Sequence, residues 1–553
     1  MTEESGEVES REESKGEAMG GGGASASSLV AAGILLSRLA GLVRERVFAQ
    51  YFGTSLYADV FRAGLRMPNA LQNLLGEGTL SASFIPVYAE LLEKGKKEEA
   101  GRMAGAIFSL LLALAGALTL VGVLLAPLIV SIFAPGFEGE RRELTIMVTR
   151  IIFPMTGLLV LSAWALGILN SHRKFFISYV APVLWNGAMI ATLVMFGGRM
   201  EVSRLVVALA WGALVGGALQ LAIQIPWVLT LERDLKIRWN TRLESVREAV
   251  RNAGPAIMGR GVVQLSGYID TFLASFLAAG ALAAVGFAQI LYMLPVSLFG
   301  MSVAAAELPE LSRQRMGEVE VLRARTSASL QRIAFYIVPS FIAFVLLGDV
   351  IVAALYQTGE FDRTDTILVY LTLVGLSVGI LASTATRLFS STFFALRDTK
   401  TPAKFAVVRV LTAAVFAFAL MVQFEAIPRF GIPAGIFGGV TIDGRSLGAV
   451  GLAMGSGLAA WLEWGLLRRA LRKRIGSVGA SASAVARMFA SALLAAGAGW
   501  GVRLLLPELH PILDALFIFM VYGFVYFAVA YLLKLDEVQG IATRLRGLAG
   551  RGR

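Results

Sequence analysis

The sequence predicts an all-α, polytopic membrane protein of about fourteen transmembrane helices. Three observations carry this prediction: the overall composition, a series of long apolar stretches, and the distribution of basic residues between loops. Of the 553 residues, 56% are hydrophobic and only 16% are charged, with a mean hydropathy of +0.70. Soluble globular domains are roughly a quarter charged, so most of this chain must face lipid or other apolar helices.

Apolar stretches long enough to cross a membrane recur along the chain. About 20 helical residues span the ~30 Å hydrocarbon core. The predicted spans are 29–52, 56–92, 103–134, 144–169, 176–197, 202–231, 249–279, 281–310, 328–357, 365–396, 403–424, 446–467, 484–506 and 511–534. The second is overlong, and Pro68 and the Gly76-Glu77-Gly78 sequence predict breaks in it. Such breaks require backbone that is covered by protein or lines a wet cavity.

The basic residues of the loops test this arrangement independently. With a cytoplasmic N-terminus, the loops predicted to lie inside hold 24 Lys and Arg residues, and those predicted to lie outside hold 8. Basic residues concentrate in cytoplasmic loops, so both termini are predicted to be cytoplasmic, in a bacterial inner membrane. The net charge of +11 is therefore a topology signal, and we expect no nucleic-acid partner.

Composition excludes several kinds of site. The chain has no cysteine, which rules out disulfides and thiolate chemistry, and its two histidines cannot form a histidine metal cluster. We expect no metal, no cofactor and no enzymatic activity. Residues 1–27 are acidic and then rich in Gly and Ser, which predicts a disordered tail and not a signal peptide.

The chain repeats itself weakly at an offset of about 225 residues. Ile129-Val130 followed by Gly136-Phe137 is echoed by Ile351-Val352 followed by Gly359 and Phe361, and the segment 84–90 is echoed by 307–311. A repeat of six helices predicts two parallel lobes, at 28–244 and 245–474, around a central cavity. Residues 475–553 then supply two additional helices and a basic tail.

Charged residues lie inside the first two predicted helices, where a side-chain charge costs several kcal/mol (~2.5–3.5) unless it is paired or wet. The first helix carries Arg38 and Arg44, and the second carries Asp59 and Arg66 on one stripe. Glu77 lies in the glycine break. One interpretation is a basic cavity for an anionic headgroup, because arginine suits phosphate oxygens. The other is a set of anchors that snorkel to the membrane surface.

The second predicted lobe carries fewer charges. Asp270 could bind a coupling cation or accept a proton, or it could be a structural partner of Arg260; the sequence leaves both open. Arg387 and Arg409 lie in later helices, and Glu463, between two tryptophans, is predicted to be interfacial. The basic run 468–474 is predicted to be a topology anchor beside anionic lipid headgroups.

These motifs resemble a known family. Ser37-Arg38-Leu39-Ala40-Gly41-Leu42-Val43-Arg44-Glu45, Ala58-Asp59, Pro68-Asn69 and Gly76-Glu77-Gly78 resemble the MurJ (MviN) lipid II flippases of the multidrug/oligosaccharidyl-lipid/polysaccharide exporter superfamily. The resemblance covers residues 29–535. It implies a monomeric cytoplasmic-membrane protein that moves undecaprenyl-diphosphate-linked peptidoglycan precursor outward by alternating access, with lipid II and membrane lipids as partners. Substrate-binding residues implied here are Arg38, Arg44, Asp59, Arg66 and Glu77.

The sequence departs from the family pattern at two positions. Gln72 and Ile290 stand where basic residues are frequent, so the second lobe contributes less positive charge to the predicted cavity. The alternative function is that of a related exporter, either a flippase for another polyprenyl-linked polysaccharide or a drug/cation antiporter. No phosphate-cradling nucleotide motif is evident, so we expect a coupling cation (sodium or proton) or the membrane potential to drive transport.

Overall fold

The computed structural model describes residues 32–33, 35–233, 235–236, 238–301, 319–507 and 509–539, with backbone alone at Glu77, 258–266 and Met301. The predicted disordered tail, the echo at 307–311 and the end of the basic tail lie outside these residues. Within them, ten helices are long and apolar enough to span a membrane. A bent pair, α14 (Arg363–Ser377) and α15 (Ile380–Ala395), would be an eleventh. The all-α membrane fold is confirmed, and the count of fourteen stays a prediction.

The chain forms two compact units that are interleaved in sequence. The first comprises the described residues up to Tyr51, with Ala63–Val130 and Gly139–Gln264; the second comprises Phe52–Arg62, Ser131–Glu138 and the described residues from Leu265 onward. The second unit therefore includes two short segments from the first half of the sequence. The predicted lobe boundaries at 244 and 474 stay predictions.

The first unit is built from helices packed around aromatic and small residues. Residues 35–51 are helical, and the further helices are α3 (Glu77–Glu93), α4 (Lys97–Leu124), α6 (Gly139–Ser171), α7 (Phe175–Phe196) and α8 (Val202–Leu231). Trp164 is 1% exposed, and its indole Nε1 donates to the Ala104 carbonyl at 3.1 Å. Gln220 donates to the Ser162 hydroxyl, which donates to Gln224. Polar groups in the apolar interior are thus paired across helices.

The second predicted span has one break where two were expected. Helix α2 (Leu56–Leu75) runs through Pro68 without interruption. The break falls at Gly76, after which α3 begins at Glu77. Gly76 is required there, because a Cβ would lie 2.4 Å from the Gln72 carbonyl oxygen. The prediction of a break at Pro68 is wrong, since transmembrane helices accommodate a proline when other groups satisfy the freed carbonyl.

The second unit contains α10 (Ala281–Pro295), followed by the π-helix η1 (Val296–Met301), then α12 (Val319–Leu346), α13 (Gly348–Tyr356), α16 (Lys400–Phe424), α17 (Gly448–Ile475), α18 (Ala482–Leu505) and α19 (Pro511–Leu532). Helix α9 (Glu244–Ser275) begins in the first unit and ends in the second. A two-stranded antiparallel hairpin, β1 (Thr441–Ile442) and β2 (Arg445–Ser446), interrupts the helices.

The two segments of the predicted repeat have the same local structure. Helix α4 is followed by the short helix α5 (Ala126–Phe133), as α12 is followed by the short helix α13. Each short helix leads to a phenylalanine that is 1% exposed, Phe137 in one copy and Phe361 in the other. The echoed residues therefore mark a structural repeat of a long helix, a short helix and a buried aromatic.

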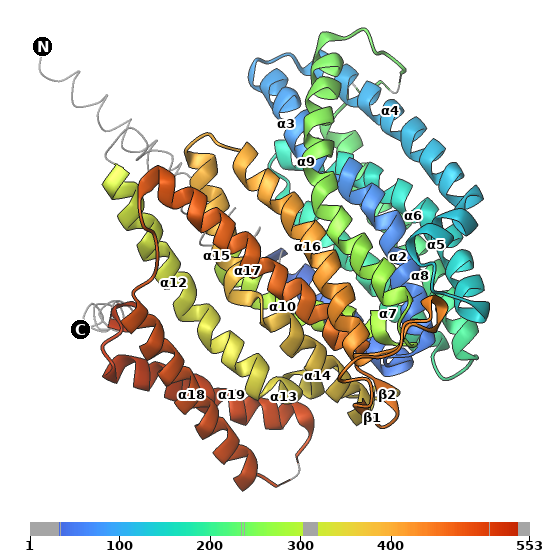
Figure 1. The fold of residues 1–553 in the computed structure, drawn as a ribbon. Helices are drawn as coiled ribbons and strands as arrows, with labels where there is room; N and C mark the ends of the chain where they lie inside the picture. Colours follow the sequence, from blue (N-terminus) through green and yellow to red (C-terminus); the bar gives the residue numbers. More distant parts are fainter. Residues whose placement is uncertain are drawn as a thin grey trace, which may run out of the picture. The chain divides into compact units, whose positions relative to one another are not determined.

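The last two helices pack on the second unit, with α18 and α19 beside α12 and α13 in Figure 1. Pro339 lies inside α12 and has no amide proton, so the Phe335 carbonyl has no helical donor. The Tyr526 hydroxyl donates to that carbonyl at 2.6 Å. Tyr522, one turn earlier in α19, donates to the Pro339 carbonyl at 2.7 Å. The proline in α12 thus supplies the polar groups that position α19.

Candidate functional site

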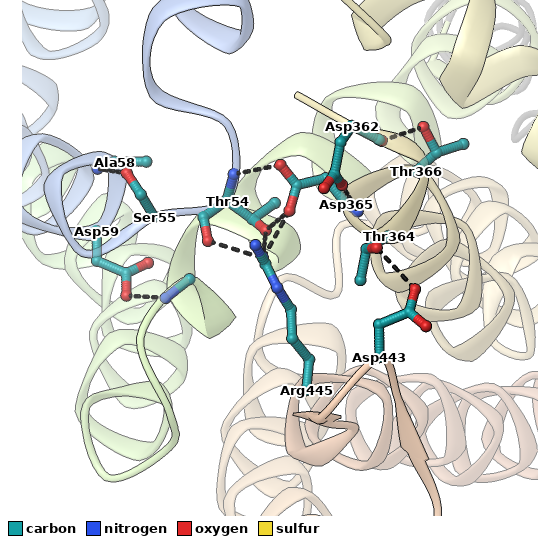
Figure 2. A network of polar contacts seen from close by, with 11 residues as sticks. Thr54, Ser55, Ala58, Asp59, Asp362, Thr364, Asp365, Thr366, Asp443 and Arg445 are labelled. Atoms are coloured by element: carbon teal, nitrogen blue, oxygen red, sulfur yellow. Dashed lines mark hydrogen bonds and ion pairs between the residues drawn. The ribbon is translucent and has the colours of Figure 1, made fainter. Parts of the chain in front are cut away.

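Asp59 lies in the first turn of α2 and is fully buried. Its Oδ2 accepts from the Gly280 amide and its Oδ1 accepts from the Ala283 amide, both at 2.7 Å. Figure 2 shows Asp59 with one of these two bonds. These amides belong to the N-terminus of α10, whose first N–H groups have no partner within the helix. A carboxylate at this position satisfies them and interacts favourably with the helix dipole. Asp59 is therefore a cap supplied from a distant part of the chain.

Gly280 permits this arrangement through its backbone conformation. Its φ is +92°, in the left-handed region that favours glycine. A Cβ at this position would also lie 2.0 Å from the Thr54 carbonyl oxygen. The turn before α2 therefore lies directly against the turn before α10.

A second polar cluster fixes the same turn to α14 (Figure 2). The Thr54 amide donates to Asp365 Oδ2 at 3.0 Å, and its hydroxyl donates to Asp365 Oδ1. Arg445, in the β-hairpin, donates to Asp365 Oδ1 at 2.6 Å and to the Thr54 carbonyl at 3.2 Å. Asp365 is 1% exposed, so its charge is removed from water and balanced by three donors. We call Thr54, Asp59, Asp365 and Arg445 the α2 clasp.

The sequence predicted Asp59 as a site residue but missed the other three members of the clasp. In the sequence, Arg445 is one of the basic residues of the predicted outer loops, and Asp365 is an acidic residue near the start of a predicted helix. Neither feature by itself indicates a site. The one sequence signal is Gly53, whose φ is +53° and where a Cβ would lie 2.6 Å from Asp365 Oδ2. A glycine in the tight turn indicates close approach, but it does not identify the residue approached.

Arg62 follows Asp59 by one helical turn on α2. Its guanidinium lies 4.3 Å from the centre of the Phe287 ring of α10. Gly286 makes room for it, because a Cβ there would lie 2.7 Å from Arg62 Nη1. A cation over an aromatic face is stabilised by about 0.5–2 kcal/mol. Helices α2 and α10 are thus joined by a cap and a cation–π contact in successive turns.

The arginines of the first helix have different surroundings. Arg44 Nη2 lies 2.5 Å from Glu45 Oε1, and its guanidinium is 5.2 Å from the centre of the Trp185 ring. Its side chain is 20% exposed. Arg38, less than two turns earlier, is exposed and also has interactions of its own. Both side chains lie on helical backbone within the first unit.

Arg66 is half-buried on α2, and it has no hydrogen bond or ion pair with any residue that the structure describes. Asn69 lies one turn further along, and its buried Oδ1 has no partner among those residues either. An unpaired guanidinium beside an unsatisfied amide is a polar surface that a ligand or water can complete.

The structure gives less detail for three of the predicted site residues. The side chains of Glu77 and Arg260 lie outside the described part of the chain; Glu77 begins α3 and Arg260 lies within α9. Asp270 is half-buried in α9 and has interactions there. Its two predicted roles, in coupling or in structure, stay open.

Two polar pairs lie inside the second unit. Arg409 Nη1 of α16 donates to Glu463 Oε2 of α17 at 3.1 Å, and Glu463 is 5% exposed. The charge of Glu463 is therefore buried and paired between two helices, and its predicted position at the membrane interface stays a prediction. Tyr292 and Ser383 are hydrogen-bonded at 2.5 Å between α10 and α15. Arg387 of α15 forms no hydrogen bond or ion pair with a carboxylate among the described residues. Because Glu463 is paired with Arg409, the positive charge of Arg387 is not balanced by an ion pair of its own.

Many apolar spans, a broken second span and charges in the first two helices are typical of a polytopic membrane transporter. The sequence model of the family described as "Lipid II flippase MurJ" matches residues 48–520. The chain belongs to the MurJ lipid II flippase family.

Individual relatives agree with this assignment. A protein of Bdellovibrio bacteriovorus, described as a probable lipid II flippase MurJ, is 30% identical over 93% of this chain and 95% of its own length. The lipid II flippase MurJ of Burkholderia cenocepacia is 32% identical over 68% of this chain and 73% of its own length.

Solved structures with low sequence identity share the fold. The structure "Lipid II flippase MurJ, inward closed conformation" is 19% identical and superimposes with a TM-score of 0.74, covering 92% of this chain and 99% of its own. An inward-facing multidrug resistance MATE family transporter of the MOP superfamily is 20% identical with a TM-score of 0.62, covering 79% of this chain and 94% of its own. The flippase fold therefore accounts for more of this chain than the antiporter fold does.

Proposed function

We propose that this protein flips lipid II, the undecaprenyl-diphosphate-linked peptidoglycan precursor, across the bacterial cytoplasmic membrane by alternating access. The observation that carries the proposal is the match of the flippase family to residues 48–520, which include the α2 clasp and Arg62 of α2. Both termini are proposed to be cytoplasmic, because the basic loops alternate accordingly. The protein acts as a monomer without a bound cofactor.

The arginines of the first unit are proposed to bind the pyrophosphate. Arg44 is oriented by its contacts with Glu45 and Trp185, so its guanidinium loses little freedom when it binds an anion. Arg66 has no described partner and is free to form charge-assisted hydrogen bonds. Arg38 adds a further positive charge on the same helix as Arg44. The alternative is that the Arg38 side chain extends to the membrane surface. That alternative predicts that substitution of Arg38 does not reduce transport.

The α2 clasp is proposed to hold one state of the transport cycle. Asp59 and Asp365 each accept hydrogen bonds that would have to break for the start of α2 to leave α10 and α14. Each such bond to a charged group contributes about 1.5–3 kcal/mol, and water can replace it once the turn is exposed. A ligand that binds the open state better can therefore shift the equilibrium.

The membrane potential or a coupling cation is proposed to drive the cycle. Movement of one elementary charge across the membrane is worth ~2.3 kcal/mol per 100 mV. Asp270 is the candidate for a sodium or proton site, and Glu77 is the candidate for a carboxylate that responds to the substrate. The Asp270 assignment rests on its position within a predicted span, and the Glu77 assignment rests on the sequence resemblance.

The test is complementation of a bacterium depleted of its own lipid II flippase, with lipid II exposure on the outer leaflet as the measurement. The wild-type chain should restore growth and exposure, and Arg44→Ala should abolish both while still inserting in the membrane. Arg199→Ala, which removes an exposed arginine, is the matched control. Failure of the inserted wild-type chain to restore exposure would favour a related exporter with another substrate.

A further inference from the structure

The second unit contains an apolar crevice with a volume of about 250 Å³. It lies between α12, α15, α17 and α18. Its walls are made by side chains such as Ile333, Val338, Leu381 and Phe489. One charged residue, Arg468, is among the residues that line it. The crevice is thus a hydrophobic slot with a single cation at its edge.

Arg468 belongs to an aromatic ladder on α17. Trp461, Trp464 and Arg468 are spaced at i, i+3 and i+7, which places them on one face of the helix. The two indole rings lie 5.3 Å apart edge to face, and the Arg468 guanidinium lies 5.0 Å from the Trp464 ring centre. Trp461 Nε1 donates to the Val378 carbonyl at 2.7 Å, which fixes the ladder to the neighbouring helix pair.

The positive charge of Arg468 is not neutralised by the described part of the protein. Glu463, the carboxylate on the same helix, is buried and paired with Arg409. Asp398 is paired with Arg474. Among the described residues no carboxylate forms an ion pair with Arg468, and its side chain is exposed. An anion is therefore the group that complements this site.

The mouth of the crevice is shaped to admit that anion. The Arg468 guanidinium lies against Gly479, in the connection between α17 and α18, where a Cβ would be 3.3 Å from Nη2. Arg472, Lys473 and Arg474 form the last turn of α17, so the mouth lies at the basic end of this helix. Basic residues and tryptophans together are typical of the level of the lipid headgroups.

We propose that this crevice is a binding site for an anionic phospholipid, with one acyl chain between α12, α15, α17 and α18 and the phosphate on Arg468. The occupant comes from the leaflet that meets the basic end of α17. An acyl chain satisfies the apolar walls without leaving polar groups unpaired, and the phosphate supplies the charge that the protein lacks. The site is independent of the proposed transport function.

The experiment uses the purified full-length protein and measures lipid retention by native mass spectrometry. The two probes are phosphatidylglycerol and phosphatidylcholine with identical acyl chains. The wild-type protein should retain phosphatidylglycerol in preference to phosphatidylcholine. Arg468→Gln should weaken phosphatidylglycerol retention about fivefold, to the level of phosphatidylcholine, because one basic residue near the surface is lost. Arg472→Gln, outside the crevice, should change it less than twofold.

Two further variants separate the contribution of the apolar crevice from that of the Arg468 charge. Ala385→Phe fills the crevice from α15 and should lower retention of both lipids, while Arg468→Lys keeps the charge and should keep most of the preference. Phosphatidylglycerol that carries a photoreactive acyl chain should label α18 near Phe489 in the wild-type protein. Equal retention of the two lipids by the wild-type protein, or unchanged phosphatidylglycerol retention in folded Arg468→Gln, would overturn the proposal.

Discussion

At the scale of single residues, the position of Asp59 explains why a carboxylate lies inside an apolar span. Its two oxygens replace the backbone partners that the first turn of α10 lacks. Sequence spacing placed Asp59 on a stripe with Arg66, which suggested a role within α2. The structure adds a partner that is more than 200 residues away in the sequence, and no local pattern identifies it.

Asp59→Asn tests the cap. The amide keeps one acceptor oxygen but loses the charge, so at least one hydrogen bond to α10 is lost and the other is weakened. We expect the free energy of unfolding to fall by about 1–3 kcal/mol, and complementation to be lost because one transport state is no longer held. Thermal unfolding in detergent and growth of the depleted strain measure the two effects. Asp536→Asn, at an exposed position, should change neither.

Asp398 offers a pH-dependent test outside the membrane spans. Its Oδ1 accepts from the Thr401 amide at 3.0 Å and its Oδ2 accepts from the Thr401 hydroxyl at 2.8 Å. These bonds, first the one to the amide and then the one to the hydroxyl, lower the pKa of Asp398 below its ordinary value, and Arg474 adds a smaller effect. A lowered pKa means that the stabilisation is complete above the ordinary aspartate pKa of about 4 and is lost as the pH falls through the lower, folded-state pKa.

The expected result is a loss of order at the start of α16 under acid conditions. Hydrogen exchange of the amides of Thr401, Ala403 and Lys404, corrected for the intrinsic rate, should accelerate as the pH falls below about 4. Asp398→Asn should give faster exchange at neutral pH and remove this pH dependence. Unchanged protection of these amides at neutral pH in Asp398→Asn would contradict the interpretation.

At the scale of elements, the prolines decide how helices are joined. Both Pro68 and Pro339 leave their helices continuous, and the carbonyl that Pro339 frees in α12 accepts a hydrogen bond from α19. The sequence marks both prolines equally. The donor to the Phe335 carbonyl comes from another helix, and only tertiary packing identifies it.

Tyr526→Phe removes the donor to the Phe335 carbonyl and leaves that carbonyl unsatisfied in an apolar environment. We expect a loss of about 1–2 kcal/mol in stability, the size of an interhelical hydrogen bond in a membrane. The loss should be concentrated in α18 and α19, as faster hydrogen exchange there. Tyr179→Phe is the control, since the Tyr179 hydroxyl has no hydrogen bond among the described residues. Equal effects of the two substitutions would show that the hydroxyl of Tyr526 does not position α19.

At the scale of the whole molecule, the α2 clasp can be tested by locking it. The chain has no cysteine, so an introduced pair is free of background. Thr54 and Asp365 are in side-chain contact, and Thr54→Cys combined with Asp365→Cys should form a disulfide under oxidising conditions. If the start of α2 must leave α14 during transport, the oxidised double variant should not flip substrate.

Reduction should restore transport by the double variant to the level of the two single variants, which lack the hydrogen bonds but cannot be cross-linked. Lipid II exposure before and after reduction is the measurement. Full activity of the oxidised, cross-linked protein would mean that the clasp stays closed throughout the cycle.

The sequence by itself determined the class of fold, because low charge, apolar stretches and repeated spacing are local properties that depend on the solvent each segment faces. It also singled out Asp59 as a candidate site residue and Gly76 as a break, since a charge or a glycine break in an apolar span needs a specific reason. It marked Glu463 from the flanking tryptophans, but it did not show that this carboxylate is buried and paired with Arg409.

Only the tertiary structure decided the partners of these residues. Thr54 meets Asp365 and Arg445 although they lie 311 and 391 residues further along the chain, and the sequence interleaving of the two units follows from such contacts. Hydrogen bonds and ion pairs are satisfied by whichever group lies nearest in space, so a sequence shows which groups need partners but not which groups supply them.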